Sequence, residues 1–244
     1  MSVGKVMLIA GGSGSVGSAI ARQAAKEGWT VAIHGRSPEK ITAVVAELGS
    51  SAEGFVADLW QEDAAETLVA EVLEQYGRLD AVIDCTATGP AGITGPFPDT
   101  DPSAFAQLLA MSIGWLERLA HEAYPHLSHN GGTLIAFVSD AGVFAAPRQA
   151  LIGAARAGAI GFIRNFACEA ARDGIRAHCI SPSYVAGSES ALRMGSERMA
   201  KAANRAGLGL PRAEDLAPLA LFLCGDGAAK ITGQVISVNG GLNA

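Results

Sequence analysis

The chain of 244 residues has little charge and no long apolar run. Only 17% of its residues are charged and the formal net charge is -6, so a general affinity for phosphate backbones is not expected and nucleic acid is excluded as a partner class. No apolar stretch approaches the roughly 18 to 20 residues that span a bilayer, so we expect no insertion into a membrane.

Cysteine is also scarce. The four thiols lie at Cys85, Cys168, Cys179 and Cys224, with no CxxC pair and no spacing typical of metal ligands. The N-terminus leads directly into an apolar run without the layout of a signal peptide. We therefore expect reduced thiols, no metal site and a cytoplasmic location.

Apolar residues make up 49% of the chain, which suits one α/β domain over residues 1–244 with helices on both faces of a sheet. Seven strand-like runs alternate with helical patterns, and this order predicts a doubly wound, parallel, seven-stranded sheet. The expected strands are 5–10, 30–34, 51–57, 81–85, 132–138, 176–181 and 235–238. The expected helices are 15–27, 38–48, 61–76, 104–127, 149–172 and 213–224.

Two segments interrupt this alternation. Residues 88–102 contain four prolines, and residues 183–209 are rich in Gly, Ser and Met with no clear strand. Both follow predicted strands at the sheet edge where ligands usually bind, so they are candidate substrate loops. The alternative is that both are surface excursions without a function.

A glycine-rich turn lies between the first strand and the first helix. Gly12, Gly14 and Gly17 satisfy the spacing GxGxxG, which allows a tight turn and lets backbone N–H groups approach a pyrophosphate at the helix N-terminus. The position between a strand and a helix makes this a strong signal for a dinucleotide. The predicted contacts are Gly11, Gly12, Ser13, Gly14, Ser15, Val16 and Gly17.

The end of the second strand indicates which dinucleotide would bind. An NAD site usually has an acid here for the ribose hydroxyls, but this chain has His34-Gly35-Arg36-Ser37. Arg36, assisted by the Ser37 hydroxyl, can pair with a 2′-phosphate, which favours NADP over NAD. The alternative is that Arg36 only faces solvent at the start of the next helix.

Taken together, these motifs give a chain that resembles the short-chain dehydrogenase/reductase family over essentially its whole length, which implies a Rossmann-like fold. Asp58-Leu59 is similar to the family's adenine-side aspartate, and 131–135 leads into Ser139 as the family's catalytic-serine strand does. The resemblance continues in the segments 181–185, 231–234 and 239–241. It also implies cofactor contacts by Asp58, Leu59, Thr86, Arg156, Pro182 and Val185.

The resemblance fails at the proton relay. In the family a Tyr protonates the carbonyl, a Lys four residues later holds the nicotinamide ribose, a Ser orients the carbonyl and an Asn supports a water. Ser139 matches the serine, but Ile152 and Arg156 stand at the Tyr and Lys positions, and Ser112 stands at the Asn position. The family's NNAG turn is replaced by 84–87, Asp-Cys-Thr-Ala.

Ile152 has no transferable proton, so a general-acid contribution of about 10²–10⁴ in rate is lost unless another group supplies it. Arg156, with a pKa above about 12, is a poor donor but is able to hold ribose hydroxyls. Water or Tyr184 is the candidate substitute, while Asp84 and Asp140 are interpreted as turn-forming unless burial raises a pKa. Halohydrin dehalogenases, which use Ser, Tyr and Arg, are a less favoured resemblance because the Tyr is missing and the glycine turn is kept.

Two functions follow from these residues. The first is an atypical NADP-dependent oxidoreductase acting on an unidentified small carbonyl, alcohol or activated alkene, with Ser139, Arg156 and Tyr184 as its catalytic candidates. The second is an inactive NADP-binding protein that serves as a sensor or assembly partner; a scaffold that binds no nucleotide is a third. The resemblance also implies a homodimer through the helices 104–127 and 149–172, or a homotetramer completed by the C-terminal segment.

Overall fold

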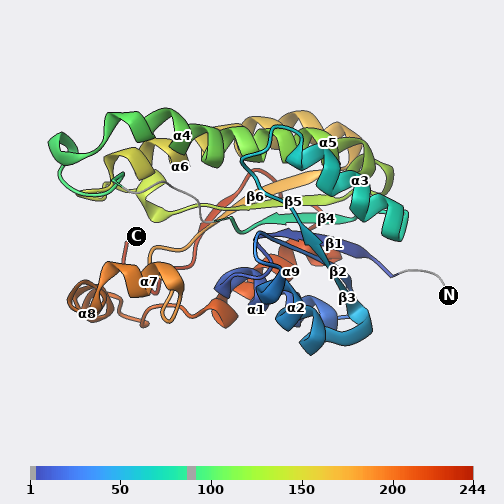
Figure 1. Cartoon of the computed structure of the whole chain (residues 1–244), viewed down its shortest axis with the longest axis horizontal. Helices are drawn as coiled ribbons and strands as arrows, with labels where there is room; N and C mark the ends of the chain where they lie inside the picture. Colours follow the sequence, from blue (N-terminus) through green and yellow to red (C-terminus); the bar gives the residue numbers. More distant parts are fainter. Residues whose placement is uncertain (1–3, 87–91, 244) are drawn as a thin grey trace.

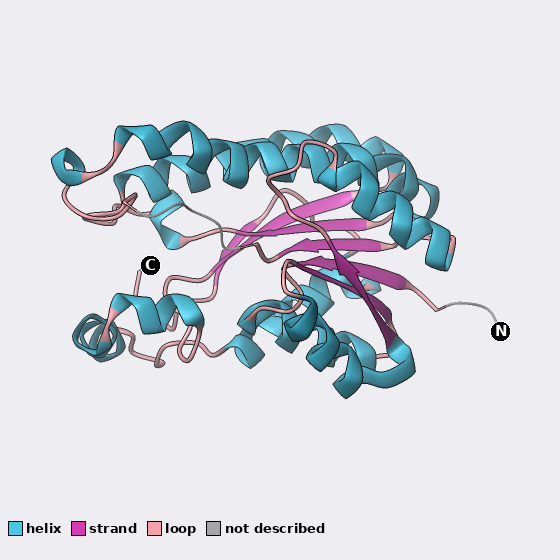
Figure 2. Ribbon diagram, viewed as in Figure 1, coloured by secondary structure: helices cyan, strands magenta, loops and turns pink. Residues whose placement is uncertain are grey.

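The computed structural model describes residues 4–86 and 92–243. Its seven strands form one parallel sheet in the order β3-β2-β1-β4-β5-β6-β7, between layers of helices (Figure 2). The predicted fold class is therefore confirmed. The strands are β1 (Val6–Ala10), β2 (Thr30–Gly35), β3 (Ala52–Val56), β4 (Ala81–Asp84), β5 (Thr133–Phe137), β6 (Arg176–Ser181) and β7 (Val235–Ser237).

Each face of the sheet has its own apolar core. Along β1, Val6, Leu8 and Ala10 pack into one core and Met7 and Ile9 into the other, because successive side chains point to opposite faces. Helices α3 (Ala64–Tyr76), α5 (Trp115–Asn130) and α6 (Ala150–Ala170) cover the first face, and α1 (Ser15–Lys26), α2 (Pro38–Leu48) and α9 (Ala213–Cys224) cover the second (Figure 1). Within residues 4–86 and 92–243, no helix combines the length and apolarity needed to cross a membrane.

The strand order reverses direction at the middle of the sheet. The chain runs outward from β1 to β2 and β3, then returns to β4 on the other side of β1. Such a switch point is where ligands bind, beyond the carboxyl ends of the strands. Ala10 pairs with Asp84 and Asp84 with Ala136, so the loops after β1, β4 and β5 leave the sheet from the same edge.

Two expected elements differ from the structure. The long helix expected over 104–127 is divided into α4 (Phe105–Leu109), a π-helical turn (Ala110–Gly114) and α5. The expected loop 183–209 contains α7 (Glu189–Met194) and α8 (Ser196–Arg205). Its Ser and Gly residues are helix boundaries: Ser188 accepts a hydrogen bond from the Ala191 N–H, and Gly195 (φ 86°) separates the two helices.

Candidate nucleotide and active site

Three glycines in the turn after β1 have no room for a side chain. Gly11 has φ 74°, and a Cβ on Gly12 would lie 2.9 Å from the carbonyl oxygen of Ile9. A Cβ on Gly17 would lie 2.4 Å from the carbonyl oxygen of Gly11, which brings α1 directly against the turn. Gly14 is exposed with φ -81°, so its conformation does not require glycine. The tight positions are therefore Gly11, Gly12 and Gly17.

Helix α1 begins at Ser15, and among the described residues no side chain caps it. Its first N–H groups are therefore available to an anion, and the helix dipole favours negative charge there. The turn also contacts β2: the Gly12 N–H donates to the His34 carbonyl at 2.8 Å, and a Cβ on Gly35 would lie 2.4 Å from Ser13 Oγ. Val16 is half-buried against the second core.

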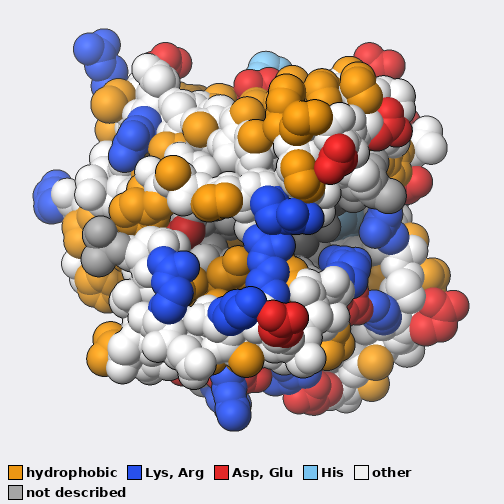
Figure 3. Space-filling model, turned by 90° about the vertical axis from the view of Figure 1, so that its left-hand side faces the viewer, with side chains coloured by type: hydrophobic (Ala, Val, Ile, Leu, Met, Phe, Trp, Pro, Cys, Tyr) orange, Lys and Arg blue, Asp and Glu red, His pale blue; other side chains and the backbone are white. Residues whose placement is uncertain are grey.

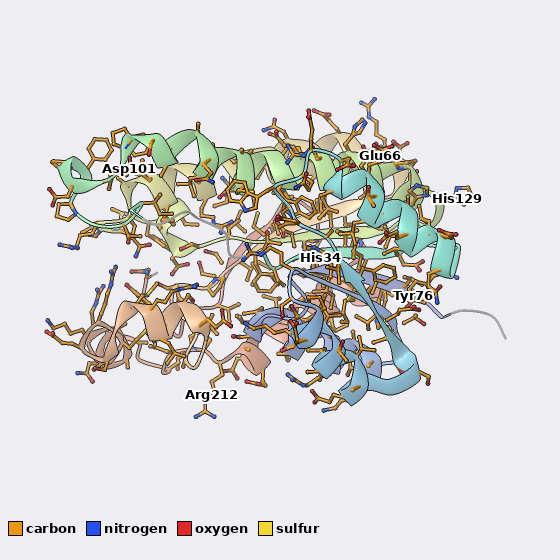
Figure 4. The ribbon with its side chains drawn as sticks, viewed as in Figure 1. His34, Glu66, Tyr76, Asp101, His129 and Arg212 are labelled. Carbon is orange, nitrogen blue, oxygen red and sulfur yellow. The ribbon has the colours of Figure 1, made fainter. Side chains whose placement is uncertain are left out.

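His34 is a site residue that the sequence patterns did not reveal. Its Nδ1 accepts a hydrogen bond from the Gly11 N–H at 3.3 Å, so Nε2 carries the proton and donates to the Ala57 carbonyl at 3.1 Å. Burial lowers its pKa to about 4, which keeps the ring neutral at physiological pH. Figure 4 places it among the strands at the centre of the molecule. A polar residue in an apolar strand was the available signal.

The end of β2 presents Arg36 to solvent, where it forms no ion pair with the described residues. Ser37 has a structural role, because its Oγ caps α2 by accepting from the Lys40 N–H at 3.3 Å and donates to Glu39 at 2.7 Å. Beyond β3, Asp58 is exposed and accepts from the Trp60 N–H at 3.3 Å, while Leu59 is buried.

Ser139 lies on a tight turn that packs directly on α6. Its Oγ accepts from the Ala141 N–H at 3.3 Å and caps a 3₁₀ turn over Asp140–Gly142. A Cβ on Gly142 would lie 2.8 Å from the main-chain carbonyl carbon of Arg156, and a Cβ on Gly153 would lie 2.7 Å from the carbonyl oxygen of Ala141. These glycines bring the Ser139 turn against the first turns of α6, which carry Ile152 and Arg156.

Ile152 forms part of an apolar wall. It is half-buried and packs against a small cluster formed by Ile93, Ala104, Leu108 and Ala155. This wall joins the first turn of α6 to α4 and to the loop after β4. No proton donor replaces the tyrosine at this position.

Asp84 at the carboxyl end of β4 and Arg156 on α6 are buried charges that act on one another electrostatically. Burial lowers the pKa of Arg156, and the Asp84 charge opposes this effect. Burial raises the pKa of Asp84, while the Thr86 hydroxyl (2.6 Å), the Thr86 N–H (3.0 Å) and the charge of Arg156 oppose the rise. The carboxyl therefore holds a proton more readily than an exposed aspartate, beside a cation that cannot donate one.

Asp140, next to Ser139, is a buried anchor with four side-chain donors. Oδ1 accepts from the hydroxyls of Ser181 (2.9 Å) and Ser237 (3.3 Å), and Oδ2 accepts from the amides of Asn239 (2.7 Å) and Asn243 (3.0 Å). Asp140 therefore fixes the Ser139 turn to β6 and to the C-terminal segment.

Other predicted residues lie around this centre. The Tyr184 ring packs with Ala202, Ala206 and Leu242, and its hydroxyl accepts from Arg198 Nε at 3.3 Å, so its contacts are with α8 and the C-terminal segment. Ser112 lies in the π-helical turn with its hydroxyl buried and without a partner among the described residues. The Pro182 carbonyl accepts from the Asp140 N–H at 3.3 Å, and Val185 is buried. Ala87, in the altered NNAG turn, lies outside the described residues.

A parallel sheet with a glycine turn at its switch point and a serine turn against the following helix defines a nucleotide-binding α/β protein. A family model described as enoyl-(acyl carrier protein) reductase matches residues 10–243. The chain belongs to the short-chain dehydrogenase/reductase family of oxidoreductases, whose members use NAD or NADP.

Individual relatives agree with this placement. Nodulation protein G of Rhizobium sp. (strain N33) is 31% identical, with 98% of this chain and 97% of that protein covered. A short-chain type dehydrogenase/reductase from Mycobacterium ulcerans has a TM-score of 0.90 at 25% identity, over 98% of this chain and 90% of that one. The 3-ketoacyl-(acyl-carrier-protein) reductase of Brucella melitensis, solved in complex with NADH, shares the fold with a TM-score of 0.88 at 24% identity and complete coverage of both chains.

Proposed function

We propose that this protein is an NADP-dependent oxidoreductase of small carbonyl, alcohol or activated-alkene substrates with a rearranged proton relay. The observation that carries the proposal is Arg36, an exposed guanidinium without an ion-pair partner among the described residues, which follows β2 beside the glycine turn. The uncapped start of α1 and the absence of space at Gly17 fit a pyrophosphate on this turn. The 2′-phosphate would pair with Arg36 through charge-assisted hydrogen bonds.

The residues of the serine turn and α6 would bind and orient the reactants. The Ser139 hydroxyl would donate to the substrate oxygen, and Arg156 would hold the ribose hydroxyls or stabilise developing negative charge. NADPH, when bound, would supply the hydride. Thr86, Pro182 and Val185 follow strands at the same edge and would contact the nicotinamide half.

The proton would come from water or Tyr184, since Ile152 has none and Arg156 retains its own. Asp84 is a further source, because burial raises its carboxyl pKa and its charge interacts with that of Arg156. Asp84→Asn preserves the shape of this group but removes its titration. If Asp84 feeds the relay, it donates only while it is protonated, so the kcat of the wild type falls as the pH rises through the pKa of Asp84. The variant should have a lower kcat and should lack this fall, while its NADPH affinity stays unchanged.

A second candidate is a non-catalytic NADP-binding protein, which the packing of Ile152 into an apolar wall favours. It predicts nucleotide binding without turnover. The double variant Ile152→Tyr, Arg156→Lys separates the two functions, because restoring a general acid is worth about 10²–10⁴ in rate. Activity that is present in the wild type and lost in Ser139→Ala supports the enzyme. Activity found only in the double variant supports the non-catalytic function.

The direct test of the enzyme is NADPH oxidation, followed by absorbance, against a panel of aldehydes, ketones and enones. We expect turnover that Ser139→Ala and Arg156→Ala both reduce, with Arg156→Lys as the conservative comparison. Turnover that is unchanged in both alanine variants would refute the assignment of these residues. NADPH binding without turnover of any compound in the panel would favour the non-catalytic function.

A further inference from the structure

We propose that the mouth of the candidate active site binds the carboxylate of an amphipathic organic anion between Arg148 and Arg198. This inference rests on the proposed function, because it assigns a substrate class to the same site. Figure 1 places α7 and α8 at the same end of the molecule as α4. Seen from that end, Lys and Arg side chains gather around a hollow in the surface (Figure 3).

The hollow is a cavity of about 690 Å³, a size that suits a small organic molecule. Its charged lining consists of Arg148, Arg198, Lys201 and Glu197. Lys201 and Glu197 are paired at 2.7 Å, which leaves the two guanidinium groups as the uncompensated charges. The first residues of α8 also line the cavity, and the positive end of that helix adds to its attraction for an anion.

Arg148 is held in an unfavourable backbone conformation. Its φ of 69° makes it the one non-glycine residue with positive φ in the described part of the chain. The carbonyl of Arg148 accepts a hydrogen bond from the Gly95 N–H at 2.9 Å, so the loop after β4 fixes this geometry. Glycine would adopt this φ without strain, so an arginine here is best explained by a role for its side chain.

Arg198 is oriented by Tyr184. Nε donates to the Tyr184 hydroxyl at 3.3 Å, and the guanidinium carbon lies 5.9 Å from the centre of the ring. Its terminal nitrogens have no hydrogen-bond partner among the described residues, so they remain free to bind a carboxylate in a two-pronged manner. Tyr184 follows β6, which places this guanidinium at the carboxyl edge of the sheet.

The neighbouring surface indicates the rest of the ligand. Arg148 precedes Ile152 by four residues, and Ile152 belongs to the apolar wall with Ile93 and Leu108. Met194 adds a further apolar side chain to the cavity. A ligand whose carboxylate binds the two guanidinium groups and whose apolar body lies along this wall matches both the charged and the apolar parts of the site. For an oxidoreductase, such a ligand is an oxo acid or a hydroxy acid.

The test compares hexanoate with hexanamide, which share one shape and differ in charge, by isothermal titration calorimetry at low salt. We expect the wild type to bind hexanoate in preference to hexanamide. Arg148→Gln and Arg198→Gln should each weaken hexanoate binding about tenfold, in keeping with the loss of a charge-assisted hydrogen bond. Arg205→Gln is the matched control, since it removes one charge from α8 at a residue that does not line the cavity.

Arg148→Gly guards against a folding artefact, because it removes the same side chain and relieves the positive φ. It should unfold at a temperature no lower than the wild type and still lose hexanoate binding. Equal loss in Arg205→Gln, or equal binding of hexanoate and hexanamide, would overturn the proposal. Inorganic phosphate that binds as tightly as hexanoate would also overturn it, by assigning the site to a free anion.

The calorimetry needs no turnover, so the two proposals fail independently. Hexanoate binding at the two arginines without NADPH oxidation would support the anion site and contradict the proposed enzymatic function. NADPH oxidation with no preference for hexanoate over hexanamide would support the enzymatic function and contradict the anion site.

Discussion

His34 should make both the stability of the fold and the geometry of the glycine turn sensitive to a fall in pH. The neutral ring accepts from Gly11 and donates to Ala57, and burial lowers its pKa from 6.5 to about 4. A protonated ring carries a proton on Nδ1 as well, and this N–H would point at the Gly11 N–H. Protonation therefore breaks the hydrogen bond between Gly11 and His34.

The sign follows from proton uptake. In the unfolded chain the histidine binds its proton with a pKa near 6.5, whereas in the folded protein it does so near 4, so between these values the unfolded state holds more protons. Stability therefore falls as the pH falls through this window. From about pH 7.5 to about pH 5, the free energy of unfolding should drop by about 2 kcal/mol through His34 alone.

Urea denaturation of the wild type and His34→Gln at both pH values measures this contribution. The glutamine cannot titrate, so the variant should lose about 2 kcal/mol less than the wild type over the same interval. His129→Gln is the control, because His129 is exposed on α5 and lies far from the glycine turn (Figure 4). Equal losses of free energy in wild type and His34→Gln between the two pH values would show that His34 does not carry this dependence.

Three further changes test other parts of the structure. Gly17→Ala adds a methyl group 2.4 Å from the Gly11 carbonyl oxygen. It should lower stability by about 1–3 kcal/mol in thermal unfolding and abolish tight NADPH binding, whereas an unchanged NADPH affinity would contradict the close packing of α1 against the glycine turn. Asp140→Asn replaces one oxygen of a buried carboxylate, which accepts from four donors, by an N–H₂ group that cannot accept. It should lower the free energy of unfolding by about 2–6 kcal/mol in urea denaturation, and a decrease below about 1 kcal/mol would contradict the network. If the chain forms the expected homodimer through α6, Gly161→Arg, which fills open space on that helix, should give a monomer in sedimentation analysis; a dimer that persists in the variant would remove α6 from the interface.

The sheet and the glycine turn were predictable because their signals are local. Each buried strand is an apolar run, and a helix with its own periodicity follows most of them. The order of the elements and the fold class can therefore be predicted from the sequence. The turn at Gly11–Gly17 follows a strand and opens a helix, which gave its position directly. Strand ends differ from the expected positions by at most one residue, as at β5, where Thr133–Phe137 lies within the expected 132–138.

The missed features depend on contacts between distant residues or on ambiguous local signals. Ser188 and Gly195 were interpreted as loop composition, although the same residue types cap and separate helices such as α7 and α8. The residues that donate hydrogen bonds to Asp140 lie 41 to 103 positions away in the sequence, so no local pattern indicates them. The role of His34 likewise needs Gly11 and Ala57, each 23 residues distant.

The proposed function depends above all on an NADP site at Arg36, which nicotinamide fluorescence during titration can probe. NADPH and NADH are titrated into the wild type and into Arg36→Ala. We predict that the wild type binds NADPH more tightly than NADH, and that Arg36→Ala weakens NADPH binding by about tenfold or more while leaving NADH binding unchanged. Equal NADPH affinity in the two proteins, or binding of neither nucleotide, would contradict the proposed site.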